Sequence, residues 1–233
     1  MKTRKISQQQ RKLLLDRGWL STQATDFCNA LLDLAEVREF PRGKTIFVEG
    51  DKVDGIDGIV SGSVGIYAGP RTDPRVLVHI MGPSEWGGGV APLGDENPRI
   101  ASPSARSDLT TVRISWASLK ELETEFADVR SRIGELTSIT MKYLLLAYTD
   151  NSSKDISVRT KAAILRLLGE GWLPNSHVPG DPVELAVTQT EIAELAHVTR
   201  NAVAPILKDL ERQGAISIGY GKTTILDRRM LRH

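Results

Sequence analysis

The chain has 233 residues, of which 40% are hydrophobic and 25% are charged, and its formal net charge is +1. These values are typical of one large or two modest globular domains, and they exclude a protein whose whole surface is basic. The single cysteine, Cys28, excludes an intrachain disulfide, a cysteine-rich zinc site and a four-cysteine iron–sulfur cluster. No apolar signal core follows the basic N-terminus, and no run of about 18 apolar residues occurs, so we expect a cytoplasmic protein with no membrane partner.

Residues 1–38 have apolar side chains at helical spacing and predict N-terminal helices. From 39 to 117 the pattern changes to short runs rich in valine and isoleucine, separated by glycines and prolines. Many short strands with tight turns predict an all-β jelly roll. The expected strands include Thr45–Val48, Gly58–Val60, Ser63–Tyr67, Val76–Ile80 and Thr110–Ile114.

Residues 118–150 predict helix again, with a long segment from Phe126 to Tyr148 that contains no proline. A helix of this length cannot cover both of its faces with a small β domain, so we expect it to pair with the same helix of a second copy. A helix packed wholly on its own domain is the alternative. The side chains that we assign to the dimer contact are Val129, Ile133, Leu136, Thr140, Tyr143 and Ala147.

A polar run at 150–155 marks a domain boundary, and residues 151–233 form the C-terminal domain. Within it, Thr188 and Glu191 have the spacing of a capping box at the start of a first helix. After a short turn, Thr199 begins a second helix with apolar residues at every third or fourth position. Two short helices joined by a tight turn are typical of a helix-turn-helix, whose second helix enters the major groove of DNA.

The outward face of the second helix has side chains suited to DNA recognition. Arg200 can donate two hydrogen bonds to guanine, and Asn201 can pair with adenine. Lys208 and the polar groups that open the first helix suit phosphates. We therefore assign to DNA contact Thr188, Gln189, Thr190, Thr199, Arg200, Asn201, Ala204, Lys208 and Lys222. An ordinary helical hairpin with a solvated polar face is the alternative interpretation.

Residues 215–226 follow the helix-stopping Gly214 and predict a β-hairpin with Lys222 near its tip. A hairpin directly after a helix-turn-helix is the winged variant of this unit. Between 187 and 233 there are seven basic and five acidic residues, a small local excess of positive charge that suits DNA.

Four segments resemble the CRP/FNR transcription regulators: GKTIFVEGDKVDGIDGIVSGSVGIY (43–67), the turn WGGG (86–89), PRIAS (98–102) and TRNAVAPILKDLERQGAI (199–216). The similarity extends over about residues 35–226. It implies an α+β fold with a cyclic-nucleotide-binding-like jelly roll, a long dimerisation helix and a winged helix-turn-helix. It also implies a homodimeric regulator, not an enzyme, that binds a two-fold-symmetric DNA site and acts on RNA polymerase.

The resemblance places an effector pocket in the β domain and on the long helix. Cyclic-AMP sensors of the family have glutamate at the position of Gly88, serine at Ile100, and a Thr-Ser pair at 146–147. Each lost hydrogen bond to a buried polar ligand costs on the order of 1–3 kcal/mol, so we expect that cyclic AMP is not the effector. The candidate pocket residues are Gly87, Gly88, Gly89, Val90, Arg99, Ile100, Ala101, Tyr143, Leu146 and Ala147.

Arg99 is the pocket residue that the family uses to grip the cyclic phosphate. Here it is expected either to bind another anion or to pair with an acid such as Asp95 or Glu96. A sensor of a cyclic nucleotide or cyclic dinucleotide that uses Arg99 with different base contacts is the alternative function.

Other sensing chemistries and other classes of protein fit less well. Haem needs axial ligands, and His79 is the only histidine in the β domain, where an isolated strand histidine is more often structural. Cys28 lies among apolar residues and is expected to be a buried small hydrophobe. We predict no metal site: a metal-dependent β-barrel enzyme would need a His/His/Glu cluster. An adaptor whose winged helix binds protein in place of DNA is a further alternative.

Two residues depart from the family pattern within the helix-turn-helix. His197 stands in the turn where glycine is common, and a left-handed conformation is tolerable for histidine. Pro205 lies inside the second helix and lacks the N–H that would bond to the carbonyl of Asn201. We therefore expect a bent or shortened second helix, with Arg200 as the remaining strong base reader and an altered half-site.

Overall fold

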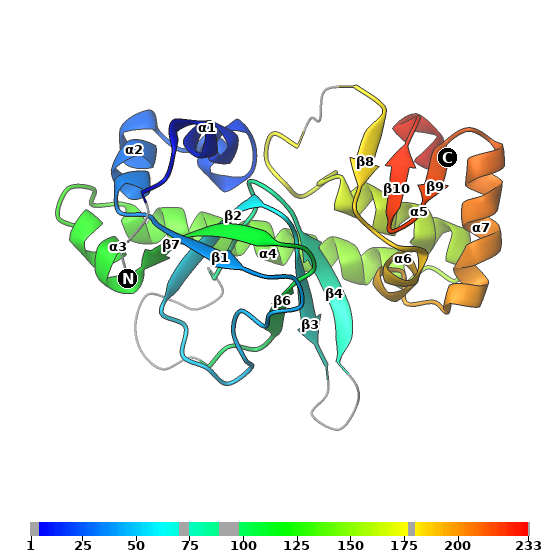
Figure 1. Ribbon diagram of the computed structural model, residues 1–233, viewed down its shortest axis with the longest axis horizontal. Coiled ribbons are helices and arrows are strands. Elements are labelled where there is room, and N and C mark those ends of the chain that lie inside the picture. The colour runs from blue at the N-terminus through cyan, green and yellow to red at the C-terminus, as the bar shows by residue number, and fades with distance from the viewer. Residues whose placement is uncertain (1–4, 70–74, 89–97, 177–179, 233) are drawn as a thin grey trace. The chain divides into compact units, whose positions relative to one another are not determined.

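The computed structural model describes residues 5–69, 75–88, 98–176 and 180–232 (Figure 1). It divides into two compact units. The first unit holds the described residues up to 75, together with 79–141 and 173–175, and the second holds 76–78, 142–172 and the described residues from 176 onward. The long helix α4 (Val129–Asn151) contributes residues to both units.

The first unit begins with helices and continues as a β domain. Ser7 and Gln10 form a capping box at the first helix: Ser7 Oγ accepts from the Gln10 N–H at 3.2 Å, and Gln10 Oε1 accepts from the Ser7 N–H at 2.9 Å. Its elements are α1 (Gln8–Asp16), η1 (Trp19–Thr22), α2 (Thr25–Asp33), β1 (Glu36–Phe40), β2 (Gly55–Ser61), β3 (Val64–Ala68), β5 (Trp86–Gly87), β6 (Ser102–Ala105), β7 (Leu109–Ser115) and α3 (Trp116–Leu122), together with the second half of β4 (Val76–Met81).

The strands form two sheets, with the orders β1-β7-β2-β5 and β4-β3-β6. In the first sheet β7 is central: it pairs antiparallel with β1 from Glu36↔Arg113 to Phe40↔Leu109 and with β2 on its other side. The predicted class, α+β with an N-terminal β domain, a long helix and a C-terminal winged helix-turn-helix, is confirmed.

Two local predictions in this region are wrong. Thr45–Val48 is not a strand, although Thr45 bridges Ser104. The opposite segment contains Pro103, which has no N–H, so the ladder between the two segments cannot be completed. Residues 36–38, expected to be helical, instead begin β1.

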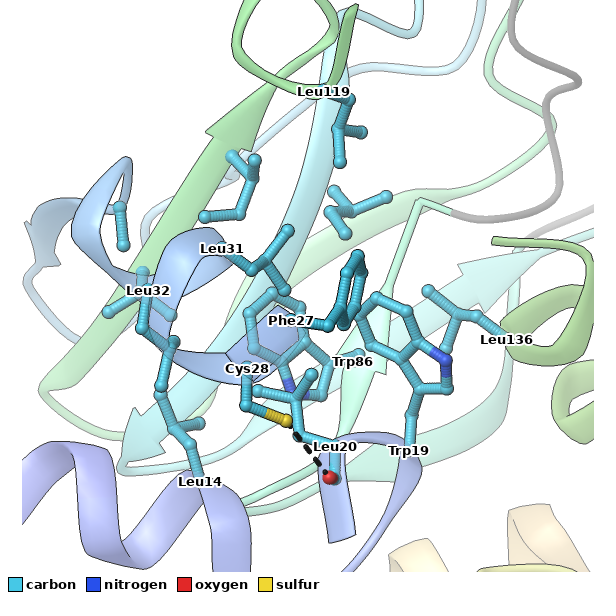
Figure 2. Close-up of a cluster of buried hydrophobic side chains, with 14 of the residues drawn as sticks. Leu14, Trp19, Leu20, Phe27, Cys28, Leu31, Leu32, Trp86, Leu119 and Leu136 are labelled. Carbon is cyan, nitrogen blue, oxygen red and sulfur yellow. Dashed lines mark hydrogen bonds between the residues drawn. The ribbon is translucent and has the colours of Figure 1, made fainter. Parts of the chain in front are cut away.

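The core of the first unit lies between the N-terminal helices and one face of the four-stranded sheet, as Figure 2 shows. The Trp19 ring packs edge-on against Trp86, with centroids 5.5 Å apart, and against Phe27 at 6.3 Å. Cys28 is buried there, and its thiol lies 3.4 Å from the carbonyl oxygen of Leu20. Burial raises the pKa of the Cys28 thiol to about 11. The prediction of a buried small hydrophobe is thus confirmed.

The second unit surrounds its own apolar core. Its elements beyond α4 are α5 (Ile156–Leu167), β8 (Val183–Leu185), α6 (Gln189–Leu195), α7 (Arg200–Arg212), β9 (Ile216–Gly219), β10 (Lys222–Ile225) and η2 (Arg228–Leu231). The strands form a sheet of order β8-β10-β9, in which β8 is an element that the sequence pattern did not indicate. Within the described residues, no helix has both the length and the apolar character that crossing a membrane requires.

Candidate DNA-binding surface and effector pocket

Helices α6 and α7 form the helix-turn-helix. Thr188 Oγ1 accepts from the Glu191 N–H at 3.2 Å, and Glu191 Oε2 accepts from the Thr188 N–H at 2.8 Å. In the turn His197 adopts φ +52°, and the Val198 N–H donates to the carbonyl of Ala193 at 2.9 Å. The predicted capping box and left-handed turn are confirmed, and they fix where α6 ends and α7 begins.

Helix α7 begins at a regular cap and buries one face. Thr199 Oγ1 accepts from the Ala202 N–H at 3.2 Å. Val203, Leu207 and Leu210 are buried in the domain core. The predicted DNA-contact side chains at the start of α7 remain accessible, because Thr199, Arg200, Asn201 and Lys208 are exposed and Ala204 is half-buried.

The prediction of a shortened α7 is wrong. The helix runs for 13 residues through Pro205. Pro205 is the sixth helical residue, so its missing N–H removes only the bond to the carbonyl of Asn201, one turn earlier. The cap at Thr199 and the packing of Leu207 and Leu210 hold the helix on either side.

The wing is the hairpin β9–β10, closed by Tyr220 and Gly221 between the paired residues Gly219 and Lys222. Gly221 has φ +70°, which favours glycine at the turn. Lys222 Nζ lies 2.5 Å from Glu184 Oε2 of β8, and Tyr220 is fully exposed at the tip. Lys222, which the sequence assigns to DNA contact, therefore forms an ion pair with a neighbouring carboxylate of its own chain.

The last turn of α4 is bonded to the helix-turn-helix. Arg166 of α5 pairs with Asp150 of α4 and also donates to the carbonyl oxygen of Leu195 at 3.1 Å. The side chain of Asn151 donates to the same carbonyl at 3.2 Å. This carbonyl belongs to the last residue of α6, so the end of α4 and α5 are both hydrogen-bonded to the helix that precedes α7.

In the β domain, Arg99 is held by the chain itself. Its Nη2 lies 3.1 Å from Asp54 Oδ1, and its guanidinium carbon lies 3.4 Å from the centroid of the Phe47 ring. Its N–H and C=O bond to Asp51 and Gly50 at 2.8 and 2.9 Å. Burial lowers the pKa of Arg99, which remains a cation at neutral pH. The structural pairing expected of Arg99 is thus present, but its acid is Asp54; Asp95 and Glu96 lie outside the described residues.

Arg113 of β7 lies at the centre of the same cluster. It pairs with Asp54 and donates to Asp57 Oδ2 at 2.8 Å, while Arg38 approaches Asp57 at 3.9 Å. Burial raises the pKa of Asp57, and the positive charges of Arg113, Arg38 and Arg99 oppose that effect. The guanidiniums of Arg38, Arg99 and Arg113 therefore all lie over the Phe47 ring, and the carboxylates of Asp54 and Asp57 pair with them.

Comparison with known proteins assigns each unit of the chain. Residues 37–125 match the domain described as "Cyclic nucleotide-binding domain". Residues 158–233 match the "Crp-like helix-turn-helix domain". The chain belongs to the CRP/FNR family of DNA-binding transcription regulators. Members of this family are regulators of transcription and in general not enzymes.

Individual relatives are distant but span most of the chain. It is 22% identical over 192 residues to the cAMP-activated global transcriptional regulator Vfr of Pseudomonas aeruginosa, covering 81% of this chain and 88% of that protein. It is 25% identical over 194 residues to a CRP-like cAMP-activated global transcriptional regulator of Mycobacterium tuberculosis, covering 81% and 82%. The fold is shared with FixK2 from Bradyrhizobium japonicum, at a TM-score of 0.69 and 16% identity over 85% of this chain and 96% of that one. It is also shared with the c-di-GMP responsive regulator CLP of Xanthomonas campestris, at a TM-score of 0.62 and 21% identity over 87% and 99%.

For a CRP/FNR regulator, the glycines after β5 are informative. Gly88 has φ +97°, and a Cβ on it would lie 2.6 Å from the carbonyl oxygen of Gly55. A side chain at this position, such as the glutamate of the family's cyclic-AMP sensors, would therefore require the backbone of Gly88 or of β2 to shift. Ile100 is 70% exposed and offers no hydrogen bond. Of the other pocket residues predicted here, Ala101 is half-buried, and Gly89 and Val90 lie outside the described residues.

The pocket residues predicted on α4 pack within the second unit of this CRP/FNR regulator. Tyr143 Oη donates to the carbonyl of Val78 at 2.9 Å, and its ring lies edge-on to Trp172 with centroids 5.0 Å apart. Leu146 covers Gly171, where an added Cβ would lie 3.2 Å from Leu146 Cδ1. Both side chains therefore have structural contacts of their own.

The assignment of the dimer face requires correction. Val129, Ile133 and Leu136 belong to the core of the first unit, and Tyr143 is buried in the second. These four side chains cannot also cover a partner, because their surfaces are already in contact with their own chain. The exposed residues of α4 instead include Ser138, Met141, Leu144, Leu145 and Tyr148, whereas Thr140 and Ala147 are half-buried.

Sequence reasoning did not identify Phe47, Asp54, Asp57 or Arg113 as parts of this CRP/FNR effector domain. One signal was available, since Arg113 stands between Val112 and Ile114 in a strand, which points it to the face opposite two core residues. His79, taken as structural, lies 3.2 Å from Glu85, and both side chains are largely buried.

Proposed function

We propose that this chain regulates transcription as a homodimer that binds a two-fold-symmetric DNA site through α7 and acts on RNA polymerase. We further propose that cyclic AMP does not activate it. Its expected compartment is the cytoplasm, where a CRP/FNR regulator meets its DNA.

The exposed first half of α7 is the observation that carries DNA recognition. Arg200 has no ion pair with another described residue, so its guanidinium is available to a guanine edge. A gel-shift titration against DNA selected from a random library tests this role. Arg200→Ala should lose about 1–3 kcal/mol for the preferred site and relax its sequence preference. Lys120→Ala, an exposed lysine of α3, is the matched control and should bind normally. Unchanged binding by Arg200→Ala contradicts the assigned role.

The exposed stripe on α4 supports the homodimer. Ser138, Met141, Leu145 and Tyr148 are separated alternately by three and four residues, and all four are exposed. That spacing is the one that brings two helices together along a seam. Leu145 is 61% and Tyr148 75% exposed, which is unusual for large apolar side chains on a helix unless another surface covers them.

Leu145→Asp tests this seam. Covering the exposed part of one leucine stabilises association by about 1–2 kcal/mol, and two-fold symmetry doubles the effect to about 2–4 kcal/mol. The dimer dissociation constant from sedimentation should therefore rise by about 30-fold or more. Val158→Asp on α5 is the control, because Val158 is 48% exposed but lies outside the stripe. Equal dissociation constants for the two variants would refute the seam.

The absence of activation by cyclic AMP is proposed from Gly88 and Ile100, although relatives are described as cAMP-activated. A side chain at Gly88 would collide with the backbone of β2, and the side chain of Ile100 is an exposed hydrocarbon without a hydrogen-bonding group. Arg99, the residue that would grip the phosphate, is engaged with Asp54 and Phe47.

A sensor of another cyclic nucleotide remains the second candidate, and one observation favours it. The Nε of Arg99 is buried without a hydrogen-bond partner among the described residues. A phosphate oxygen could accept from it. Calorimetric titration of the full chain with cyclic AMP and with cyclic di-GMP separates the candidates. Micromolar binding of cyclic AMP would overturn the main proposal, and micromolar binding of cyclic di-GMP alone would establish the second.

A further inference from the structure

The side of α7 that points away from the protein core has a proline at its centre. Val203, Leu207 and Leu210 form the buried stripe, and the residues two positions before each of them are Asn201, Pro205 and Lys208. An offset of two residues is about 200° around a helix, so these three side chains lie on the opposite side. All three are exposed.

The chemistry of this outward face is polar at its ends and apolar in its middle. Arg200 and Asn201 stand at the start and Lys208 one turn beyond the middle. Between them the Pro205 ring and the half-exposed methyl of Ala204 offer only carbon atoms, without a hydrogen-bond donor. A base edge opposite this middle section therefore meets hydrocarbon.

The proline gives the chain itself no evident benefit at this position. Proline inside a helix removes a hydrogen bond and crowds the preceding turn, so it is the least favourable helical residue. Burial could offset that cost, but Pro205 is exposed. A contact made outside the chain explains its presence better than internal packing does.

We propose that Pro205, with Ala204, reads the 5-methyl group of a thymine in the major groove of each half-site. The inference rests on the DNA-binding function of the family. The thymine methyl is the apolar group of the major groove, and the other base edges present donors or acceptors there. Those polar groups would lose water against the proline ring and gain no hydrogen bond in return. The thymine methyl makes no hydrogen bond to water, so it loses none when the proline ring covers it.

The expected effect is modest but measurable. Burying one methyl group corresponds to about a fourfold change in affinity, and two symmetric half-sites give about fifteenfold. A second consequence follows from the same contact. A cytosine at that position should bind better when it carries a 5-methyl group.

The experiment uses the full-length protein and a duplex selected from a random library. Each thymine of the selected half-site is replaced in turn by uracil, which removes only the methyl group. At one position, this replacement should weaken the affinity of the protein for the duplex about fourfold per half-site. Pro205→Ser should bind thymine and uracil duplexes equally at that position, with circular dichroism confirming its fold. Lys208→Ala, the control, should weaken binding to both duplexes and leave their ratio unchanged.

Each result decides the inference. Equal affinity for thymine and uracil at every position of the half-site overturns it. An undiminished methyl preference in Pro205→Ser also overturns it, since Pro205 would then contribute nothing to the methyl contact. If the selection enriches no sequence at all, the DNA-binding function fails, and this result is distinct from sequence-specific binding that is blind to the methyl group.

Discussion

Gly88→Ala is the substitution that most directly tests the account of the effector domain. At φ +97° an L side chain is strained by about 1–3 kcal/mol. The new Cβ would also lie 2.6 Å from the Gly55 carbonyl oxygen and 3.0 Å from Ile56 Cα. Both are backbone atoms of β2 in the four-stranded sheet, and displacing them costs about another 1–3 kcal/mol. The free energy of unfolding should therefore fall by at least about 2 kcal/mol, which lowers Tm by about 4 °C or more.

The neighbouring Gly87 provides a matched control. A Cβ at Gly87 would lie 3.4 Å from the end of the Met81 side chain, an ordinary contact with a flexible group. Gly87→Ala should change the unfolding free energy by no more than about 0.5 kcal/mol.

Urea unfolding followed by tryptophan fluorescence suits this comparison, because Trp19, Trp86 and Trp116 all lie in the first unit. If Gly88→Ala and Gly87→Ala unfold at the same urea concentration, the predicted collision of a Cβ at position 88 with the backbone of β2 is refuted. Steric exclusion at position 88 would then not account for a failure to bind cyclic AMP. Under the same geometry, Gly88→Glu should destabilise the chain without creating cyclic-AMP binding.

Two further predictions concern buried ionisable groups. Cys28 should not react with a thiol reagent at pH 8 in the native protein, since a pKa of about 11 leaves about one thousandth as thiolate; rapid native labelling would contradict its burial. Because this pKa is raised on folding, the stability that Cys28 contributes is present below about pH 9 and lost as pH rises towards 11, and Cys28→Ala should remove that dependence. Asp57→Ala should lower the unfolding free energy by about 3 kcal/mol, because it leaves the buried Arg113 with one carboxylate fewer. Asp209→Ala, at an exposed pair with Arg212, should change it by about 0.5 kcal/mol or less, and equal effects of the two would argue against a structural role for the buried cluster.

The helix-turn-helix could be predicted residue by residue because its signals are local. A capping box needs only Thr188 and Glu191 three positions apart, and the buried stripe of α7 follows from helical periodicity. The left-handed conformation of His197 agrees with the expectation from the family resemblance, since glycine is common at this position of the turn. These features are set by atoms within one or two helical turns, so no distant contact is required to establish them.

The long helix α4 shows what local pattern could not decide. Its apolar residues are spread around the helix, so periodicity alone did not distinguish the face that packs on the chain from the face left exposed. The first unit took Val129, Ile133 and Leu136 into its core, and Leu145 and Tyr148 remained outside.

The sequence by itself determined the order of domains and the helix-turn-helix, whereas the DNA-reading face and the loss of cyclic-AMP contacts stay predictions. Only the tertiary structure decided the partner of Arg99, because Asp54 is 45 positions away and is brought near by backbone hydrogen bonds between the two loops that contain these residues. It alone showed that Gly88 lies against the backbone of β2 and that α7 continues through Pro205. In each case the deciding atoms are distant in sequence or depend on packing, where a residue's type does not specify its neighbours.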